Sequence, residues 1–86
     1  MPRLSRFYGI SIYMHYADHA PPHVHAVYAG RSAAFAIRDG SVLAGRMPRR
    51  ATRLVRSWIL RRGRQLEANW TRATRGEPLV PVEPLE

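Results

Sequence analysis

Residues 48–75 read PRRATRLVRSWILRRGRQLEANWTRATR and carry the longest periodic pattern in the chain. Apolar side chains recur there at intervals of three and four residues, and they stay in phase at about 100° per residue, as on one face of a helix. These side chains are Ala51, Leu54, Val55, Trp58, Ile59, Leu66, Trp70 and Ala73. The pattern predicts one long helix that begins at about Pro48, because a first turn tolerates proline, and that ends before Gly76. Gly63 lowers the stability of this helix by about 1 kcal/mol relative to alanine, and a break at Gly63 is the alternative.

The segments before this helix alternate apolar and polar residues, which is the pattern of half-buried strands. In the first segment the apolar positions are Tyr8, Ile10, Ile12 and Met14. Four strands are predicted in all. They cover Phe7–Met14, His23–Ala29, Ser32–Arg38 and Ser41–Ala44.

Three connections join these strands. Residues 15–22 are predicted to form a loop because the pair Pro21–Pro22 cannot donate the hydrogen bonds of a sheet. Gly30–Arg31 makes a short connection, and Asp39–Gly40 is the strongest signal for a two-residue hairpin turn. We therefore expect neighbouring strands to pair in sequence order, as a meander.

The resulting fold class is α+β, with a four-stranded antiparallel meander packed against one long C-terminal helix. A chain of 86 residues is too short for two hydrophobic cores. We expect residues 1–76 to form this single domain. Residues 77–86 have proline at every third position, which favours an extended, polyproline-like tail. The tail either packs on the domain or binds a partner.

The composition restricts the classes of function. Fourteen Lys+Arg residues face six Asp+Glu, which gives a formal net charge of +8, and all fourteen cations are arginines. This charge predicts attraction to a polyanion, either nucleic acid or an acidic protein. The chain has no cysteine, which excludes disulfides, thiolate metal sites and a cysteine nucleophile. Glycine-rich phosphate loops and nucleophile-elbow motifs are also absent from the sequence.

The sequence contains no apolar run near the roughly 20 residues of a membrane span, and no signal-peptide core follows the first residues. We therefore expect a cytoplasmic protein without membrane contact.

All four histidines fall between residues 15 and 25, as His15, His19, His23 and His25. His23 and His25 are two residues apart on a predicted strand, so both imidazoles leave the same side of it. One interpretation is a zinc or nickel site, completed by His19, Asp18 or His15. A second is acid–base chemistry on RNA, in which one imidazole accepts the ribose 2′-hydroxyl proton and another protonates the leaving oxygen. The third is a structural role in capping the Pro-Pro turn.

The arginines of the helix divide by angle. Those opposite the apolar face are Arg49, Arg53, Arg56, Arg64 and Arg75, and those on one flank are Arg50, Arg61 and Arg72. Arg62 points toward the apolar face. The candidates for binding phosphate or nucleic acid are Arg50, Arg53, Arg56 and Arg62. The alternative is a basic face that is simply solvated.

Several motifs resemble a bacterial family known as domain of unknown function 4160. The matching segments are residues 2–10, 12–14, 18–26, 48–51, 58, 69–70, 76–78 and 83–85. The most specific piece is Pro-Pro-His-x-His-Ala at residues 21–26. The resemblance implies a small prokaryotic protein encoded beside another small domain of unknown function, numbered 2442. Such pairs are regarded as toxin–antitoxin modules, so the resemblance implies an antitoxin-like protein partner but no established reaction.

Our leading hypothesis is a toxin-like protein of a two-gene module that acts on RNA or the translation apparatus. His23 and His25 would be the acid–base pair, assisted by Tyr13 or His19, and Arg50 or Arg62 would stabilise the phosphate. This hypothesis assigns no residue to a metal and needs no cofactor.

The alternative is a non-catalytic module that binds nucleic acid or a partner through its basic helix face, above all through Arg53 and Arg56. Either hypothesis is compatible with a homo-oligomer.

Overall fold

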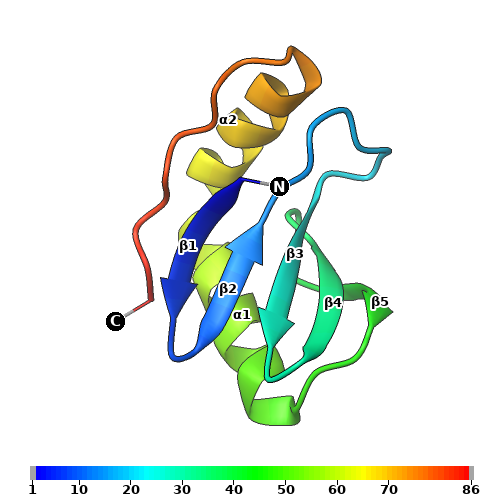
Figure 1. Ribbon diagram of the computed structural model, residues 1–86, viewed down its shortest axis with the longest axis vertical. Helices are drawn as coiled ribbons and strands as arrows, with labels where there is room; N and C mark the ends of the chain where they lie inside the picture. Colours follow the sequence, from blue (N-terminus) through cyan, green and yellow to red (C-terminus); the bar gives the residue numbers. More distant parts are fainter. Residues whose placement is uncertain (1, 86) are drawn as a thin grey trace.

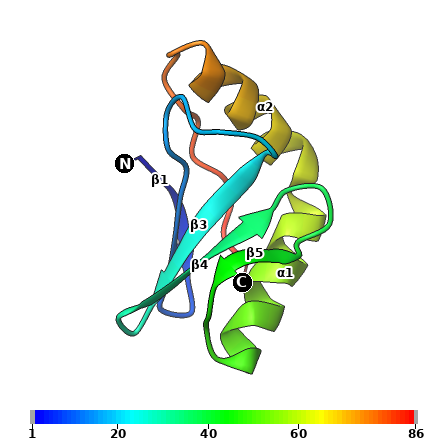
Figure 2. The same ribbon diagram turned by 90° about the vertical axis from the view of Figure 1, so that its right-hand side faces the viewer.

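Five antiparallel strands and two consecutive helices make up the structure, a computed structural model that describes residues 2–85 (Figure 1). The elements are β1 (Arg3–Phe7), β2 (Ile10–Tyr13), β3 (His23–Tyr28), β4 (Arg31–Ala36), β5 (Val42–Gly45), α1 (Arg49–Arg61) and α2 (Gly63–Thr74). The strands lie in the order β1-β2-β3-β4-β5, and both helices lie on one side of the sheet (Figure 2). The predicted α+β class and the meander are confirmed, but the predicted counts of four strands and one helix are wrong.

The extra strand comes from the segment 7–14, which is not one strand. Tyr8 and Gly9 have φ angles of 50° and 77° and form a two-residue turn between β1 and β2. Ala29 and Gly30, with φ angles of 49° and 77°, form the corresponding turn between β3 and β4. Left-handed conformations at both turn positions match the twist of the paired strands, so such turns close hairpins tightly.

The pair Asp39–Gly40 does not form the predicted two-residue hairpin. It lies within a longer connection, because β4 ends at Ala36 and β5 begins at Val42. Within this connection the Gly40 N–H donates to the Ala36 carbonyl, and the Ser41 N–H donates to the Asp39 carboxylate.

The predicted long helix is interrupted at Arg62, one residue before the glycine at which a break was expected. Arg62 has φ −111° and ψ 16°, outside the helical range. Its N–H still donates to the Trp58 carbonyl, and its own carbonyl accepts from the Leu66 N–H. These two bonds continue the helical pattern across Arg62, so α2 follows α1 as a bent continuation (Figure 2). Pro48 is the residue before α1 rather than its first helical residue.

The core lies between the helices and one face of the sheet. The helical side chains that are buried there include Ala51, Val55, Trp58, Ile59 and Leu66. The sheet contributes Ile10, Ile12, Met14, Val24, Ala26 and Phe35, all fully buried. Trp58 is central, because its ring lies 5.4 Å from that of Phe7 and its indole N–H donates to the Glu83 carbonyl.

The C-terminal tail packs on the domain, which answers the question that the sequence left open. Asn69, only 1% exposed, donates through Nδ2 to the Val80 carbonyl and accepts the Val80 N–H at Oδ1. Further along, the Val82 N–H donates to the Leu4 carbonyl of β1. The tail therefore runs beside the outer edge of β1 (Figure 1).

No helix among residues 2–85 is both long enough and apolar enough to span a membrane.

We predict that Trp58→Ala lowers the free energy of unfolding by about 3 to 5 kcal/mol, because it leaves a cavity against Phe7 and removes the bond to Glu83. Denaturant unfolding followed by far-UV circular dichroism measures this loss. Leu60→Ala is the matched control on the same helix, since Leu60 is 62% exposed and its removal should change stability by less than about 0.5 kcal/mol. Equal effects of the two substitutions would contradict the packing described here.

Candidate functional site

His25 lies on the sheet face that the helices leave uncovered. Along β2 and β3, Ile10, Ile12, Val24 and Ala26 face the helices and are fully buried, whereas Tyr13 and His25 alternate with them and remain partly exposed. The register places Tyr13 directly opposite His25, and His25 opposite Ala34 of β4. Directly opposed residues of an antiparallel sheet share a face. This row of side chains therefore crosses the open face of the sheet.

The connection between β2 and β3 places Asp18 at the centre of the histidines. Its carboxylate oxygen Oδ1 accepts the His19 backbone N–H at 2.8 Å and lies 2.9 Å from His19 Nδ1. The other oxygen, Oδ2, lies 2.9 Å from His23 Nε2 and 3.2 Å from His25 Nε2. One carboxylate thus joins three of the four histidines.

These donors hold Asp18 in its ionised form. Partial burial acts to raise its pKa, but the His19 N–H bond, the His25 bond and the charge and bond of His23 outweigh burial. The net effect lowers the pKa of Asp18 from 3.8 to about 2. The group is therefore a carboxylate throughout the neutral and mildly acidic range.

His23 is buried and holds the Asp18 carboxylate in place. It is only 4% exposed, its ring centroid lies 5.3 Å from that of Trp70, and its Nδ1 lies 2.7 Å from the Pro21 carbonyl. Its Nε2 faces the Asp18 carboxylate, so both ring nitrogens face oxygen acceptors. These two contacts tie the loop to the start of β3.

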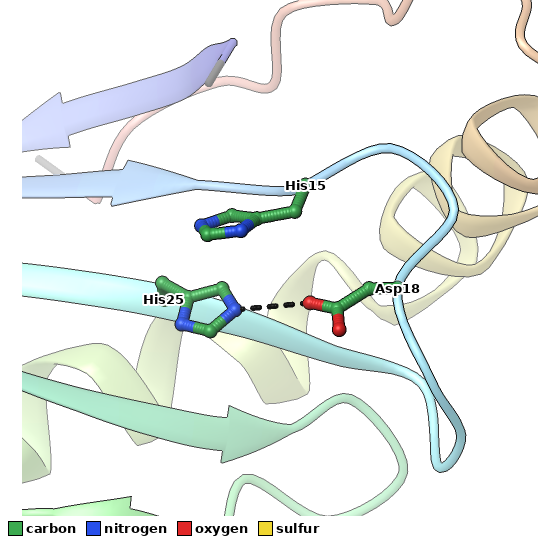
Figure 3. A group of neighbouring side chains, drawn as sticks. All are labelled: His15, Asp18 and His25. Atoms are coloured by element: carbon green, nitrogen blue, oxygen red, sulfur yellow. Dashed lines mark hydrogen bonds and ion pairs between the residues drawn. The ribbon is translucent and has the colours of Figure 1, made fainter.

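His25 and His15, unlike His23, are partly exposed to solvent. The side chain of His25 is 29% exposed, and its Nε2 is held by Asp18 (Figure 3). The His15 ring stacks on it, with centroids 4.1 Å apart and planes inclined by 29°. Burial, and then the nearby charge of His25, lower the pKa of His15, while Asp18 opposes this shift. The two rings also place ligand atoms near the Asp18 carboxylate, within 4.8 Å of one another, a spacing that could hold a metal ion.

A shallow hollow borders His25 on the side of β4 and β5. Its volume is about 260 Å³. It is lined by His19, Ala20, Pro21, His23, His25, Ala34, Leu43 and Ala44. The small alanine side chains of β4 and β5 leave this space open beside the imidazole.

Of the residues predicted as catalytic, the structure brings together His19, His23 and His25 around Asp18, with Tyr13 beside His25 in register. His19 is the most exposed of them, with 86% of its side chain accessible.

The four predicted phosphate-binding arginines do not join this cluster. Arg50 lines a separate small hollow with Tyr8 and Tyr28, and Arg56 packs beside Gly40. Arg62 donates to the Pro84 carbonyl of the tail. Arg53 is exposed on α1. Within residues 2–85, none of the four takes part in the hydrogen bonds or ion pairs of the histidines.

Sequence reasoning missed two features of the site. It considered Asp18 and His15 only as further metal ligands and did not foresee that Asp18 joins three histidines or that His15 stacks on His25. It also missed Arg3, which is exposed and pairs in register with Tyr13, in the same row as His25. Recognition of the turn at Tyr8–Gly9 would have revealed β1 and therefore Arg3.

Residues 9–71 match the model of a family described as Domain of unknown function (DUF4160). Comparisons with curated proteins and with solved structures find no match to this chain.

We predict that Asp18 couples the stability of the protein to acid pH. Its pKa is lower in the folded chain than its ordinary value, so the stabilisation is complete above about pH 4 and is lost as the pH falls through 2. Asp18→Asn should therefore lower the free energy of unfolding at pH 6 by about 2 kcal/mol and flatten its dependence on pH between 4 and 2. Urea unfolding at a series of pH values measures both effects.

Glu67→Gln provides the control, because Glu67 is exposed on α2 and takes no part in the histidine cluster. If Asp18→Asn and Glu67→Gln give the same pH profile as the unsubstituted protein, Asp18 does not play the part assigned to it.

Proposed function

The chain belongs to the DUF4160 family, and from its histidine cluster we propose that it is a toxin-like protein of a two-gene module that binds and cleaves RNA on its open sheet face. The observation that carries this proposal is the pair of stacked imidazoles, His15 and His25, with Asp18 behind His25. An antitoxin-like protein partner is part of the same proposal.

The charge and surface of the open face suit a single strand of RNA. The chain carries a net charge of +8, which attracts phosphates from a distance. On the open face, Arg6 pairs in register with Ser11, and Arg3 pairs with Tyr13. Both arginines are exposed and Tyr13 is partly exposed. Arginine and an aromatic ring on a sheet face are the groups that bind the phosphates and stack the bases of single-stranded RNA.

Around Asp18, His23 has a structural role, whereas His15 and His25 are available for proton transfer to a substrate. Both nitrogens of His23 already face acceptors, so proton transfer by His23 would break a buried contact. His25 uses only Nε2 in the hydrogen bonds among residues 2–85, which leaves Nδ1 for a substrate. The proposed acid–base pair is therefore His15 and His25 rather than His23 and His25.

The proposed reaction is transesterification of the RNA backbone. His15 accepts the proton of a ribose 2′-hydroxyl, and the 2′-oxygen attacks the adjacent phosphorus. The bond from phosphorus to the 5′-oxygen breaks, and His25 donates a proton to that leaving oxygen, which yields a 2′,3′-cyclic phosphate and a free 5′-hydroxyl. Asp18 orients His25 through Nε2, and Arg3, whose Cα partner across the sheet is Tyr13, would neutralise the charge that develops on the phosphate oxygens.

A non-catalytic binding module is the second candidate, and one observation favours it. The arginines that were predicted to lie opposite the apolar helix face are all exposed: Arg49, Arg53, Arg56, Arg64 and Arg75. They form a basic outer surface on the other side of the molecule from the histidines. This surface would bind a polyanion without chemistry.

We predict that the protein arrests bacterial growth when it is expressed alone, and that co-expression of the neighbouring gene restores growth. His25→Ala should abolish the arrest and lower the rate of RNA cleavage by at least about 100-fold, because proton transfer commonly contributes this much. His19→Ala is the matched control, since its ring is 86% exposed and its backbone N–H to Asp18 remains. Cleavage is followed on a short labelled RNA, with the cyclic phosphate identified by mass spectrometry.

The two candidates differ in the residues on which they depend. If the double variant Arg53→Ala, Arg56→Ala abolishes RNA binding and growth arrest while His25→Ala leaves both unchanged, the binding module is correct. Retention of cleavage by a variant that lacks both His15 and His25 would exclude the proposed chemistry.

A further inference from the structure

We propose that His15, Asp18 and His25 bind one divalent transition-metal ion, with zinc or nickel as the preferred metals. One ligand atom from each residue lies within 4.8 Å of the others (Figure 3). His15 and Asp18 come from the connection that follows β2, and His25 comes from β3, so folding brings the three side chains together.

The spacing of the ligand atoms is close to that of a metal site. Zinc binds imidazole nitrogen and carboxylate oxygen at roughly 2.0–2.2 Å, so ligand atoms in a tetrahedral site are roughly 3.3 Å apart. His25 Nε2 and Asp18 Oδ2 are already 3.2 Å apart. Since all three ligand atoms lie within 4.8 Å, His15 needs to approach by at most about 1.5 Å, which rotation of its side chain supplies.

The carboxylate is held in place by groups outside the proposed ligand set. The His19 backbone N–H fixes one oxygen of Asp18, and the buried His23 ring fixes the other. Hydrogen bonds of this kind orient the ligands of known metal sites and commonly raise metal affinity by 10- to 100-fold. His23 thus supports the site, whereas both of its own nitrogens are occupied.

The donor set selects the class of metal. Two imidazoles and one carboxylate suit zinc, nickel and similar ions, whereas magnesium and calcium prefer oxygen ligands alone. Three protein ligands leave at least one coordination position for water or a substrate. The three residues are partly exposed, so such a position would be reachable from solvent.

This inference does not rest on the proposed RNA chemistry, because metal binding is measured without RNA. The two proposals use the same two side chains, because a bound ion would be coordinated by ring nitrogens of His15 and His25. A metal at the site is therefore expected to inhibit the proton transfers of RNA cleavage.

The test uses the full chain, purified without a histidine tag and freed of metal with a chelator. Titration with Zn²⁺ and with Ni²⁺ against a chromophoric chelator should give one ion per chain, and millimolar Mg²⁺ should not compete. His15→Ala is the decisive variant, since it removes one proposed ligand and leaves the contacts of Asp18 with His19, His23 and His25 in place, and it should weaken binding at least tenfold. His25→Ala should weaken binding similarly, whereas the control Glu67→Gln, on the exposed face of α2, should stay within twofold of the unsubstituted protein.

Nitrogen-15 spectra of the imidazoles give a second measurement. On addition of Zn²⁺, the ring resonances of His15 and His25 should shift, and those of the exposed His19 should not. A protein that binds no Zn²⁺ above the competing chelator, or one in which Glu67→Gln weakens binding as much as His15→Ala, overturns the proposal.

Cleavage assays with and without Zn²⁺ separate the two proposals. Metal binding without cleavage under either condition supports the metal site and removes the RNA chemistry. Cleavage by a protein that binds no metal supports the RNA chemistry and removes the metal site.

Discussion

The carboxylate of Asp18 is the constraint on which the arrangement of the site depends. Taking an ionised group partly out of water costs several kcal/mol unless its oxygens receive hydrogen bonds. Asp18 receives them from His19, His23 and His25, which lie on a loop and on a strand. The contacts with His23 and His25 fix the connection between β2 and β3 against the sheet, and the contact with His19 lies within the connection. The same carboxylate therefore closes the loop, orients His25 and leaves the His15 ring stacked above it.

One face of the sheet can carry polar side chains because the hydrophobic core lies against the other face. Both helices cover one face of the sheet, and the tail covers the outer edge of β1. Residues 77–85 form no strand, so side chains supply part of their hydrogen bonding: Asn69 bonds to both backbone groups of Val80, and the Trp58 indole bonds to the Glu83 carbonyl. The core is completed in this way without Arg3, Tyr13 and His25. These three residues form a row on the open face of the sheet and are not part of the hydrophobic core.

Local periodicity predicted the elements well and their ends poorly. The helix phase and the alternation in β3 were both visible in the sequence, including the placement of His23 and His25 on one side. Tyr8 fits the period of two that continues from Ile10, so the turn at Tyr8–Gly9 looked like strand, and β1 was missed. The burial of His23 could not be predicted, because it depends on Trp70, which is 47 positions further along the chain, and on a loop whose shape is set by Asp18.

The charges that attract a polyanion from a distance and the charges within the histidine cluster lie on different parts of the molecule. The net charge of +8 acts over a Debye length of about 8 Å or more, so the exposed helix arginines raise the local concentration of a polyanion without touching the histidines. Within the site the groups are different, because the carboxylate of Asp18 lies among His19, His23 and His25. A phosphate or a metal ion bound there would meet two imidazoles and one carboxylate rather than a uniform positive field. Salt should therefore weaken the capture of a polyanion while leaving the geometry around Asp18 unchanged, since the pair of Asp18 and His23 is largely shielded from solvent.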